Sequence, residues 1–242
     1  MKRGLVSVTF RQLPCEEIIR LCRENGLSYI EWGGDIHVPA GDTGKAAEVE
    51  ELCRAAGVTP LGYGSYYNAS DDFARFQPVL DTARALGAGY VRIWAGKSRE
   101  YDRTAEENIK KAVLEAERYG IAVCLECHRW TMTEDPGLAV RLAQRTGCFL
   151  HFQPNPDITF EENLSALQAF SPYLCALHVF AWEKGDVRLP LSRHTDQWVK
   201  YATAAGDVPF LLEFVAENDP ENLKNNAAAL AAILELRDEN RV

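Results

Sequence analysis

The sequence predicts a (β/α)₈ barrel that forms a single domain over residues 1–242. Eight short apolar runs alternate with longer amphipathic segments along the whole chain, and glycine repeatedly separates a helix-like segment from the next run. No change in composition marks a linker between domains. Eight serial βα units of similar size are typical of a closed parallel barrel. An open, doubly wound sheet is the main alternative, but the sequence has no glycine-rich phosphate loop to support it.

The eight apolar runs are rich in Val, Ile, Leu, Phe and Tyr, which favours buried strands. In chain order they are LVSVTF (5–10), SYIEW (28–32), TPLGYG (59–64), YVRIWAG (90–96), IAVCLECH (121–128), CFLHFQ (148–153), CALHVFAW (175–182) and PFLLEFV (209–215). Parallel strands are covered on both faces and should be almost entirely apolar. An ionisable residue inside one of these runs therefore indicates a specific structural or functional role.

The segments between the runs carry the signals of helices. Residues 15–26 and 46–57 each place apolar side chains on one helical face and end in glycine. The same joint of helix, glycine and strand recurs along the chain, at Gly26, Gly57, Gly87, Gly120, Gly147 and Gly206. This repetition is what a series of βα units requires.

Two helix starts carry capping signals. The segment Thr104 to Glu107 fits a capping box that opens a helix closing at Gly120. Asp219 followed by Pro220 fits the N-cap and first position of the last helix. We expect that alanine- and leucine-rich helix to run to about Arg237.

The bulk composition limits the classes of partner. The chain carries 26 Lys and Arg against 35 Asp and Glu, a formal net charge of −9, and an acidic surface disfavours nucleic acid. No apolar stretch approaches the roughly 18 residues of a membrane span, so we expect no membrane partner. The first apolar run breaks at Arg11, which does not fit a secretion signal, and we expect a cytoplasmic protein. Nothing in the sequence decides between a monomer and a homodimer.

The seven cysteines are an odd number, scattered through predicted helices and strands. With no secretion signal, we expect reduced thiols. Cys124 and Cys127 form a C-x-x-C pattern, but residues three apart on a strand point to opposite faces. We therefore expect neither a redox pair nor a zinc site there.

Three strong bases stand in strands that should be apolar. Glu126, His178 and Glu213 each lie toward the carboxyl end of a run, and in a barrel those ends meet at one mouth. Because converging carboxylates repel one another, the pattern predicts one divalent metal ion, and mixed oxygen and nitrogen ligands suit Mn²⁺, Mg²⁺, Co²⁺ or Zn²⁺. The alternative is structural: each glutamate pairs with an arginine across the mouth, for which Arg92 and Arg129 are available.

Other polar residues follow the second run. Glu31, Asp35 and His37 stand at or just beyond its end, and Gly33 and Gly34 allow the backbone to turn sharply there. We count Asp35 and His37 as candidate substrate contacts. The alternative is an ordinary polar loop.

The remaining candidates lie at the ends of later runs. Gln153 offers a carbonyl oxygen to a metal, whereas His151, of the same parity, better fits a hydrogen-bonded core histidine. Trp94 and Trp182 fall near strand ends, where aromatic rings can wall a pocket and stack on sugars, although each alone also fits the core. Residues 97–99, Lys-Ser-Arg, fit either a phosphate contact or a solvated loop.

Taken in order, these motifs resemble a known family. They are EWGGDIHVP (31–39), VRIWAG (91–96), LECH (125–128), QPN (153–155), LHVFAW (177–182) and LLEF (211–214). Over nearly its whole length the chain is similar to the xylose-isomerase-like TIM barrels of the sugar phosphate isomerase/epimerase group. The resemblance implies the same barrel and a small-molecule carbohydrate substrate.

The resemblance also implies roles for single residues. The family holds one divalent metal with Glu, Asp, His and Glu after strands five to eight, which correspond here to Glu126, Gln153, His178 and Glu213. The two glutamates would also move protons on the substrate. His128 would contact the substrate, with Asn155 of the QPN motif nearby, and Arg188 would help to close the pocket. Gln153 departs from the family's Asp, which removes a charge and should weaken metal binding.

The leading hypothesis is a metal-dependent isomerase or epimerase that transfers a proton next to a carbonyl of a sugar, sugar phosphate or related polyol. One glutamate would remove the proton and the other would return it. Two alternatives stay open. The same metal site would serve a dehydratase of an inosose or keto-sugar, and weakened metal binding through Gln153 would leave a non-catalytic sugar-binding barrel.

Overall fold

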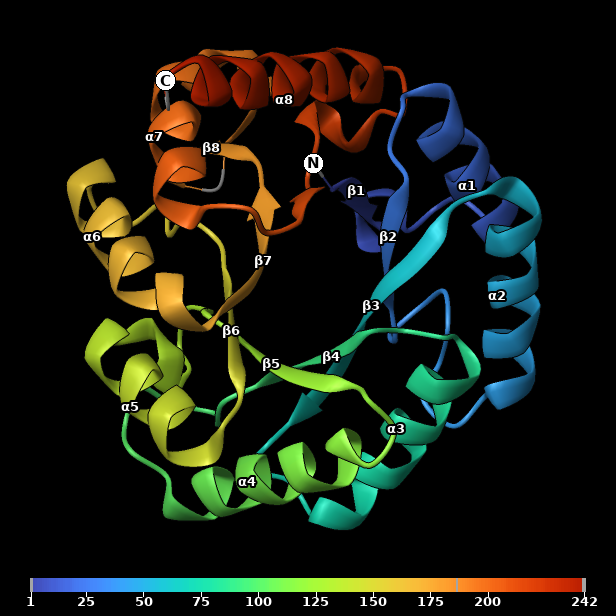
Figure 1. Cartoon of the computed structure of the whole chain (residues 1–242), viewed down its shortest axis with the longest axis vertical. Coiled ribbons are helices and arrows are strands. Elements are labelled where there is room, and N and C mark those ends of the chain that lie inside the picture. Colours follow the sequence, from blue (N-terminus) through green and yellow to red (C-terminus); the bar gives the residue numbers. More distant parts are fainter. Residues whose placement is uncertain (1, 186, 241–242) are drawn as a thin grey trace.

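A closed ring of eight parallel strands forms the centre of the molecule (Figure 1). The computed structural model describes residues 2–185 and 187–240. The strands are β1 (Arg3–Val6), β2 (Tyr29–Gly33), β3 (Thr59–Asn68), β4 (Tyr90–Trp94), β5 (Ala122–Glu126), β6 (Phe149–Phe152), β7 (Leu174–Val179) and β10 (Phe210–Leu212). Each pairs in parallel with its neighbour along the chain, and β10 closes onto β1 in the register Gly4–Leu211. The predicted (β/α)₈ barrel is confirmed.

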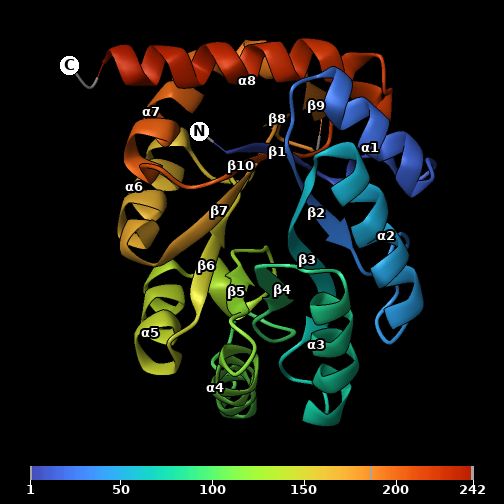
Figure 2. The ribbon, with the colours of Figure 1, turned by 45° about the vertical axis from the view of Figure 1, so that its right-hand side comes forward.

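Eight α-helices within the described residues surround the ring. They are α1 (Cys15–Glu24), α2 (Thr43–Ala56), α3 (Phe76–Ala85), α4 (Arg103–Glu117), α5 (Pro136–Thr146), α6 (Phe160–Phe170), α7 (Thr195–Ala205) and α8 (Asn222–Glu239). Figure 2 shows the longest, α8, lying beside α7 across the top of the view. No helix of this part of the chain is both long enough and apolar enough to cross a bilayer.

The predicted helix ends are confirmed more often than the predicted starts. Gly57 and Gly147 end α2 and α5 at φ values of 69° and 78°, which L side chains rarely adopt. The capping box at residues 104–107 is wrong, because Asp102 caps α4 by accepting a hydrogen bond from the amide of Ala105. Asp219 accepts from the amide of Glu221 and so stabilises a turn just before α8.

Two of the predicted runs leave the barrel sheet and form another structure before they end. Residues 7–10 leave the sheet in a 3₁₀ turn, where the Ser7 hydroxyl accepts a hydrogen bond from the amide of Gly33 (2.8 Å). The run 175–182 divides into β7 and a short strand, β8 (Ala181–Glu183), which forms an antiparallel hairpin with β9 (Val187–Leu189). This hairpin stands at the mouth of the barrel and forms part of the site described below.

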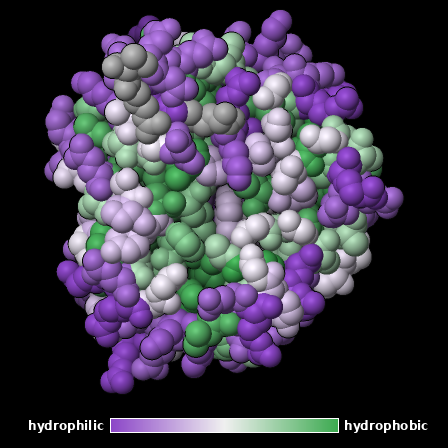
Figure 3. Space-filling model, in the orientation of Figure 1, coloured by the Kyte–Doolittle hydropathy of each residue, from purple (hydrophilic) through white to green (hydrophobic). Residues whose placement is uncertain are grey.

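The core has two parts. The larger lies between strands and helices, and the smaller fills the barrel interior with buried residues that include Val6, Tyr90 and Leu211. Hydrophilic residues predominate around the outer ring of helices in Figure 3, with more hydrophobic ones toward the centre of that face. Cys124 and Cys175 point into the barrel interior from β5 and β7 and form a disulfide, so the expectation that all cysteines are reduced is wrong for these two.

Candidate active site

A pocket of about 150 Å³ opens at the carboxyl ends of the strands, where the loops after β4 to β7 and β10 meet. Seven of the residues selected from the sequence line it: Trp94, Glu126, His128, Gln153, Asn155, Trp182 and Glu213. We call this cavity the mouth pocket. Its position agrees with the rule that barrel enzymes carry their chemistry at this end.

Glu213 and His178 form a buried pair at the floor of the mouth pocket. Glu213 directly follows β10, and its amide donates to the carbonyl of Val179 (3.0 Å), which extends the parallel pairing by one residue. The Glu213 Oε2 atom lies 3.1 Å from His178 Nδ1, but within the described chain neither atom has a partner with hydrogen-bond geometry. Buried polar atoms of this kind call for a ligand, an ion or water.

Glu126, on the opposite side of the mouth pocket, is held by two donors. The guanidinium of Arg92 and the indole Nε1 of Trp94 both donate to its Oε2 atom. Burial raises the pKa of the Glu126 carboxyl, but Arg92 and His178 outweigh burial, so the pKa is lowered. Glu126 is therefore paired with Arg92, as the structural alternative in the sequence analysis predicts.

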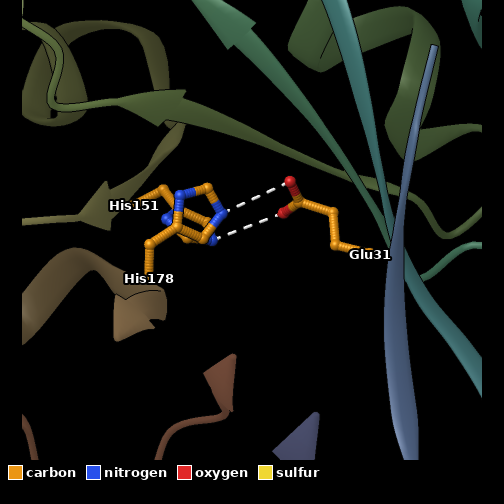
Figure 4. A group of neighbouring side chains, drawn as sticks. All are labelled: Glu31, His151 and His178. Atoms are coloured by element: carbon orange, nitrogen blue, oxygen red, sulfur yellow. Dashed lines mark ion pairs between the residues drawn. The ribbon is translucent and has the colours of Figure 1, made fainter. Parts of the chain in front are cut away.

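A second group of ionisable side chains lies deeper in the barrel (Figure 4). The carboxylate of Glu31 accepts hydrogen bonds from Tyr90 Oη (2.6 Å) and Arg92 Nε (2.8 Å), and both His151 Nε2 and His178 Nε2 lie 3.4 Å from it. One ligand atom from each of Glu31, His151 and His178 lies within 4.8 Å of the others, so these three could hold a metal ion. We call them the inner group.

The sequence did not single out this inner group. Glu31 was counted with a polar loop and His151 as a core histidine, and neither Tyr90 nor Arg92 was assigned to the site. The missed signal is placement: Glu31, Arg92 and His151 are each an ionisable residue flanked on both sides by apolar residues of a strand.

The two neighbouring histidines, His151 and His178, have opposite pKa shifts although their ring centroids are only 4.1 Å apart, with the rings tilted by 58°. Burial and the neighbouring His178 lower the pKa of His151 to about 4, so this ring is neutral. Burial also disfavours a charged His178, but Glu213 and Glu31 outweigh it and raise its pKa to about 10. His178 is thus the histidine whose positive charge the two carboxylates favour.

Aromatic rings wall one side of the mouth pocket. Trp182, at the start of the hairpin, lies with its ring centroid 4.8 Å from those of both Phe180 and Phe214. Arg188, on β9, places its guanidinium carbon 4.5 Å from the Phe214 centroid and donates to the side chain of Asn218. Arg188 therefore lies behind the wall, where it holds the hairpin against the loop after β10.

The backbone around the mouth pocket is strained. Tyr66 and Phe214 both line the pocket, and both have left-handed φ values, 58° and 54°. Left-handed backbone is costly for bulky residues and tends to cluster at functional sites. Phe214 directly follows Glu213, so one strained residue stands next to a candidate catalytic glutamate.

The remaining predicted contacts differ in where they lie. His128 and Asn155 line the mouth pocket; His128 Nδ1 lies 2.7 Å from the carbonyl oxygen of Arg129. Asp35 and His37 are not among its lining residues. Asp35 forms an ion pair with Arg11, and the ring nitrogens of His37 contact the Ser7 hydroxyl (2.9 Å) and the Leu13 carbonyl (3.2 Å).

The cations of residues 97–99 are engaged outside the mouth pocket. Lys97 forms an ion pair with Asp71, and Arg99 pairs with Glu134 at 2.7 Å. Both cationic side chains are largely exposed, at 64% and 65%. This arrangement fits the solvated-loop alternative rather than a phosphate contact in the pocket.

Comparisons with known proteins agree with this architecture. The sequence matches the family described as xylose isomerase-like TIM barrel over residues 19–195. No curated protein matches the chain. At the level of solved structures, one similar protein is a probable 3-DHS dehydratase, AsbF, involved in petrobactin synthesis from Bacillus anthracis. The identity is 17%, the TM-score is 0.77, and the match covers 96% of this chain and 99% of that one.

Two further structures extend the range of similar proteins. D-psicose 3-epimerase with D-tagatose, from Clostridium cellulolyticum H10, shares 15% identity at a TM-score of 0.68, with 98% of this chain and 99% of that chain covered. A xylose isomerase-like TIM barrel protein from Mycobacterium smegmatis in complex with magnesium shares 16% identity at a TM-score of 0.67, with 94% and 92% covered. At such identities the likeness concerns the fold.

Proposed function

The chain belongs to the xylose isomerase-like TIM barrel family, and from that premise we propose that it is a divalent-metal-dependent isomerase or epimerase. Its reaction would be proton transfer next to a carbonyl of a sugar or related polyol. The observation that carries the proposal is the pair of glutamates, Glu126 at the end of β5 and Glu213 just after β10, which line one small pocket. Epimerisation needs a proton acceptor on one face of the substrate carbon and a proton donor on the other, and two such groups can supply both.

The side chains present fit a divalent cation by charge. Three buried carboxylates, Glu31, Glu126 and Glu213, face one buried guanidinium, that of Arg92. With His178 protonated, as its raised pKa favours, the cluster carries one negative charge in excess. Loss of that proton, which a metal ligand requires, leaves two negative charges, and a dication would neutralise them. The partnerless buried atoms of Glu213 and His178 are of the types that Mn²⁺, Mg²⁺, Co²⁺ and Zn²⁺ accept.

We propose that Glu126, Gln153, His178 and Glu213 would hold the ion, rather than the inner group. Glu126, Gln153 and Glu213 line the mouth pocket, where a substrate has access to them. Glu31 has no exposed surface and does not line the mouth pocket, so an ion held by the inner group would be out of reach of a substrate. Gln153 would contribute its carbonyl oxygen without a charge, so the ion should bind more weakly than in a site with an aspartate there.

The two glutamates would have different tasks. Glu126 is held by Arg92 and Trp94, and these donors stabilise its negative charge. Glu213 Oε2 has no such donor within the described chain, which makes Glu213 the better candidate to take the proton. A bound divalent cation would supply stabilisation of the negative charge that develops on the substrate oxygen. His128 and Asn155 would orient substrate hydroxyls, and the aromatic wall would exclude water.

The proposal is tested with Glu213→Gln. We expect the variant to keep the melting temperature of the metal-free protein and to lose about 10²- to 10⁴-fold in turnover, the usual contribution of a general base. Turnover is measured by NMR as exchange of substrate carbon-bound hydrogen with D₂O, over a panel of aldoses and ketoses with Mn²⁺. Glu217→Gln, an exposed glutamate four residues further on, is the matched control and should be fully active.

Undiminished exchange in Glu213→Gln would refute the role of this residue. The mass of the product separates the reaction classes, because isomerisation and epimerisation leave the mass unchanged. Loss of the mass of one water would instead support the dehydratase alternative.

A further inference from the structure

A second cavity, of about 310 Å³, adjoins the mouth pocket. The two share a partition made by the loop after β6 and the start of the β8–β9 hairpin, with Asn155, Phe180 and Trp182 lining both. We call the second cavity the side pocket. The mouth pocket, at about 150 Å³, is the smaller of the two, and a substrate with a second ring would extend beyond it.

Aromatic rings form much of the side pocket. Tyr201 of α7 lies with its ring centroid 5.1 Å from that of Phe160 and 5.3 Å from that of Trp198. The Trp198 indole donates to the carbonyl of Phe180 (2.9 Å), which ties this surface to the partition. Trp198 and Tyr201 are only 1% and 3% exposed, so they form the packed back wall of the side pocket. The half-buried rings of Phe160 and Trp182 are the aromatic surfaces that the C–H face of a sugar ring can reach.

The polar lining of the side pocket favours an uncharged ligand. Glu183, His194 and Gln197 bring hydrogen-bond donors and acceptors to its edge, alongside Asn155. No lysine or arginine is among its lining residues, and Glu183 would repel an anion. A phosphate or carboxylate group is therefore a poor fit, whereas hydroxyl groups can pair with amide, imidazole and carboxylate alike.

We propose that the side pocket binds a neutral sugar ring joined to the reacting sugar, so that the substrate is a glycoside or disaccharide. The reacting ring would occupy the mouth pocket, a placement that rests on the function proposed above. The second ring would lie against Phe160 and Trp182 and hydrogen-bond to His194 and Gln197. The side pocket itself is a binding site whether or not Glu213 acts as a base.

The test is calorimetric titration of the full chain with sugars that differ only in the second ring. The probes are D-glucose, the disaccharides maltose, cellobiose and sucrose, and glucose 1-phosphate, each with Mn²⁺ present. We expect at least one disaccharide to bind about tenfold or more tightly than D-glucose. We expect glucose 1-phosphate to gain nothing over D-glucose.

Two variants and a control test whether the side pocket causes the preference for disaccharides. Gln197→Ala and His194→Ala should reduce disaccharide binding to the level of D-glucose and leave D-glucose binding unchanged. Thr203→Ala, an exposed residue on the same helix, should keep the preference. The proposal is overturned if no disaccharide binds more tightly than D-glucose, if both variants keep the preference, or if glucose 1-phosphate binds most tightly.

The outcomes separate this proposal from the catalytic one. If Glu213→Gln remains active, the assigned base is wrong, but a disaccharide preference that disappears in Gln197→Ala still establishes the side pocket. If Glu213→Gln is inactive and disaccharides show no advantage, the catalytic role stands and the side pocket proposal fails.

Discussion

His178 links the two groups of buried side chains. Its Nδ1 atom lies 3.1 Å from Glu213 at the floor of the mouth pocket, and its Nε2 atom lies 3.4 Å from Glu31 in the inner group. A single imidazole thus faces two carboxylates along two different directions. Any change at Glu31 should therefore be felt at Glu213 through the orientation of this ring.

His37 offers a test of a histidine outside the mouth pocket. Burial lowers the pKa of His37 below its ordinary value of 6.5, more than the Leu13 carbonyl and Asp35 raise it. The unfolded chain therefore takes up a proton at a higher pH than the folded chain does. The stability that depends on neutral His37 is present above pH 6.5 and falls as the pH drops through the folded-state pKa.

We expect His37→Asn to reduce this acid sensitivity. The free energy of unfolding, measured with urea between about pH 7.5 and about pH 5.5, should fall less with decreasing pH in the variant than in the wild type. Equal pH dependence in the two proteins would contradict the assignment. Loss of catalytic activity with no change in pH dependence would instead favour the substrate contact predicted from the sequence.

At the level of single residues, the sequence predicted the residues that line the mouth pocket better than the residues that hold them in place. Glu126, Gln153 and Glu213 were predictable because each is a polar residue at the end of an apolar run. Arg92 was visible only as an available partner, because its two carboxylates come from strands 61 and 34 residues away in the chain. Such pairings depend on barrel register, which no local pattern contains.

Among the elements, β4 is the strand that carries a buried cation. The side chain of Arg92 is 4% exposed and bridges Glu31 of β2 to Glu126 of β5, with β3 lying between β2 and β4. The space for it comes from β3: a Cβ atom built on Gly64 would lie 2.5 Å from an Arg92 nitrogen. A glycine in β3 therefore allows the arginine in β4.

Arg92→Met should strongly destabilise the protein. The substitution leaves two buried carboxylates without their cation, and removal of one partner from a buried ion pair typically costs about 3–5 kcal/mol. The measurement is urea unfolding followed by circular dichroism. Arg103→Met, which removes an 83% exposed partner of Glu107, is the control and should leave the unfolding midpoint unchanged. Similar losses of unfolding free energy in both variants would contradict a specific stabilising role of the Arg92 bridge.

The hairpin β8–β9 is the element that sequence reasoning did not predict. The apolar run 175–182 suggested one continuous strand, but the chain leaves the barrel after Val179 and pairs antiparallel with residues 187–189. One apolar run can contain two consecutive strands, because hydrophobic periodicity does not show which other strand a residue pairs with. The role predicted for Arg188, to help close the pocket, stays a prediction.

For the whole molecule, the regular alternation of runs was enough to predict a closed barrel. The Cys124–Cys175 disulfide was not predictable, because it joins residues 51 apart in sequence that meet only when β5 and β7 both face the barrel interior. The same limit applies to the inner group, whose ligand atoms lie within 4.8 Å of one another and come from three different strands. The inner group shares His178 with the metal site proposed at the mouth pocket.

Metal binding should raise the stability of the whole barrel, and the variant that loses this effect identifies the site. At Mn²⁺ about 100 times its dissociation constant, linkage adds about 2.7 kcal/mol, which for a chain of this size raises the melting temperature by roughly 5–11 °C. We expect Glu213→Gln and His178→Gln to abolish this rise and Glu31→Gln to retain most of it. If Glu31→Gln abolishes the rise while Glu213→Gln keeps it, the ion binds to the inner group, out of reach of a substrate. If Mn²⁺ does not raise the melting temperature of the wild type, and metal analysis finds far less than one ion per chain, the metal-dependent mechanism fails and a non-catalytic sugar-binding barrel becomes the better account.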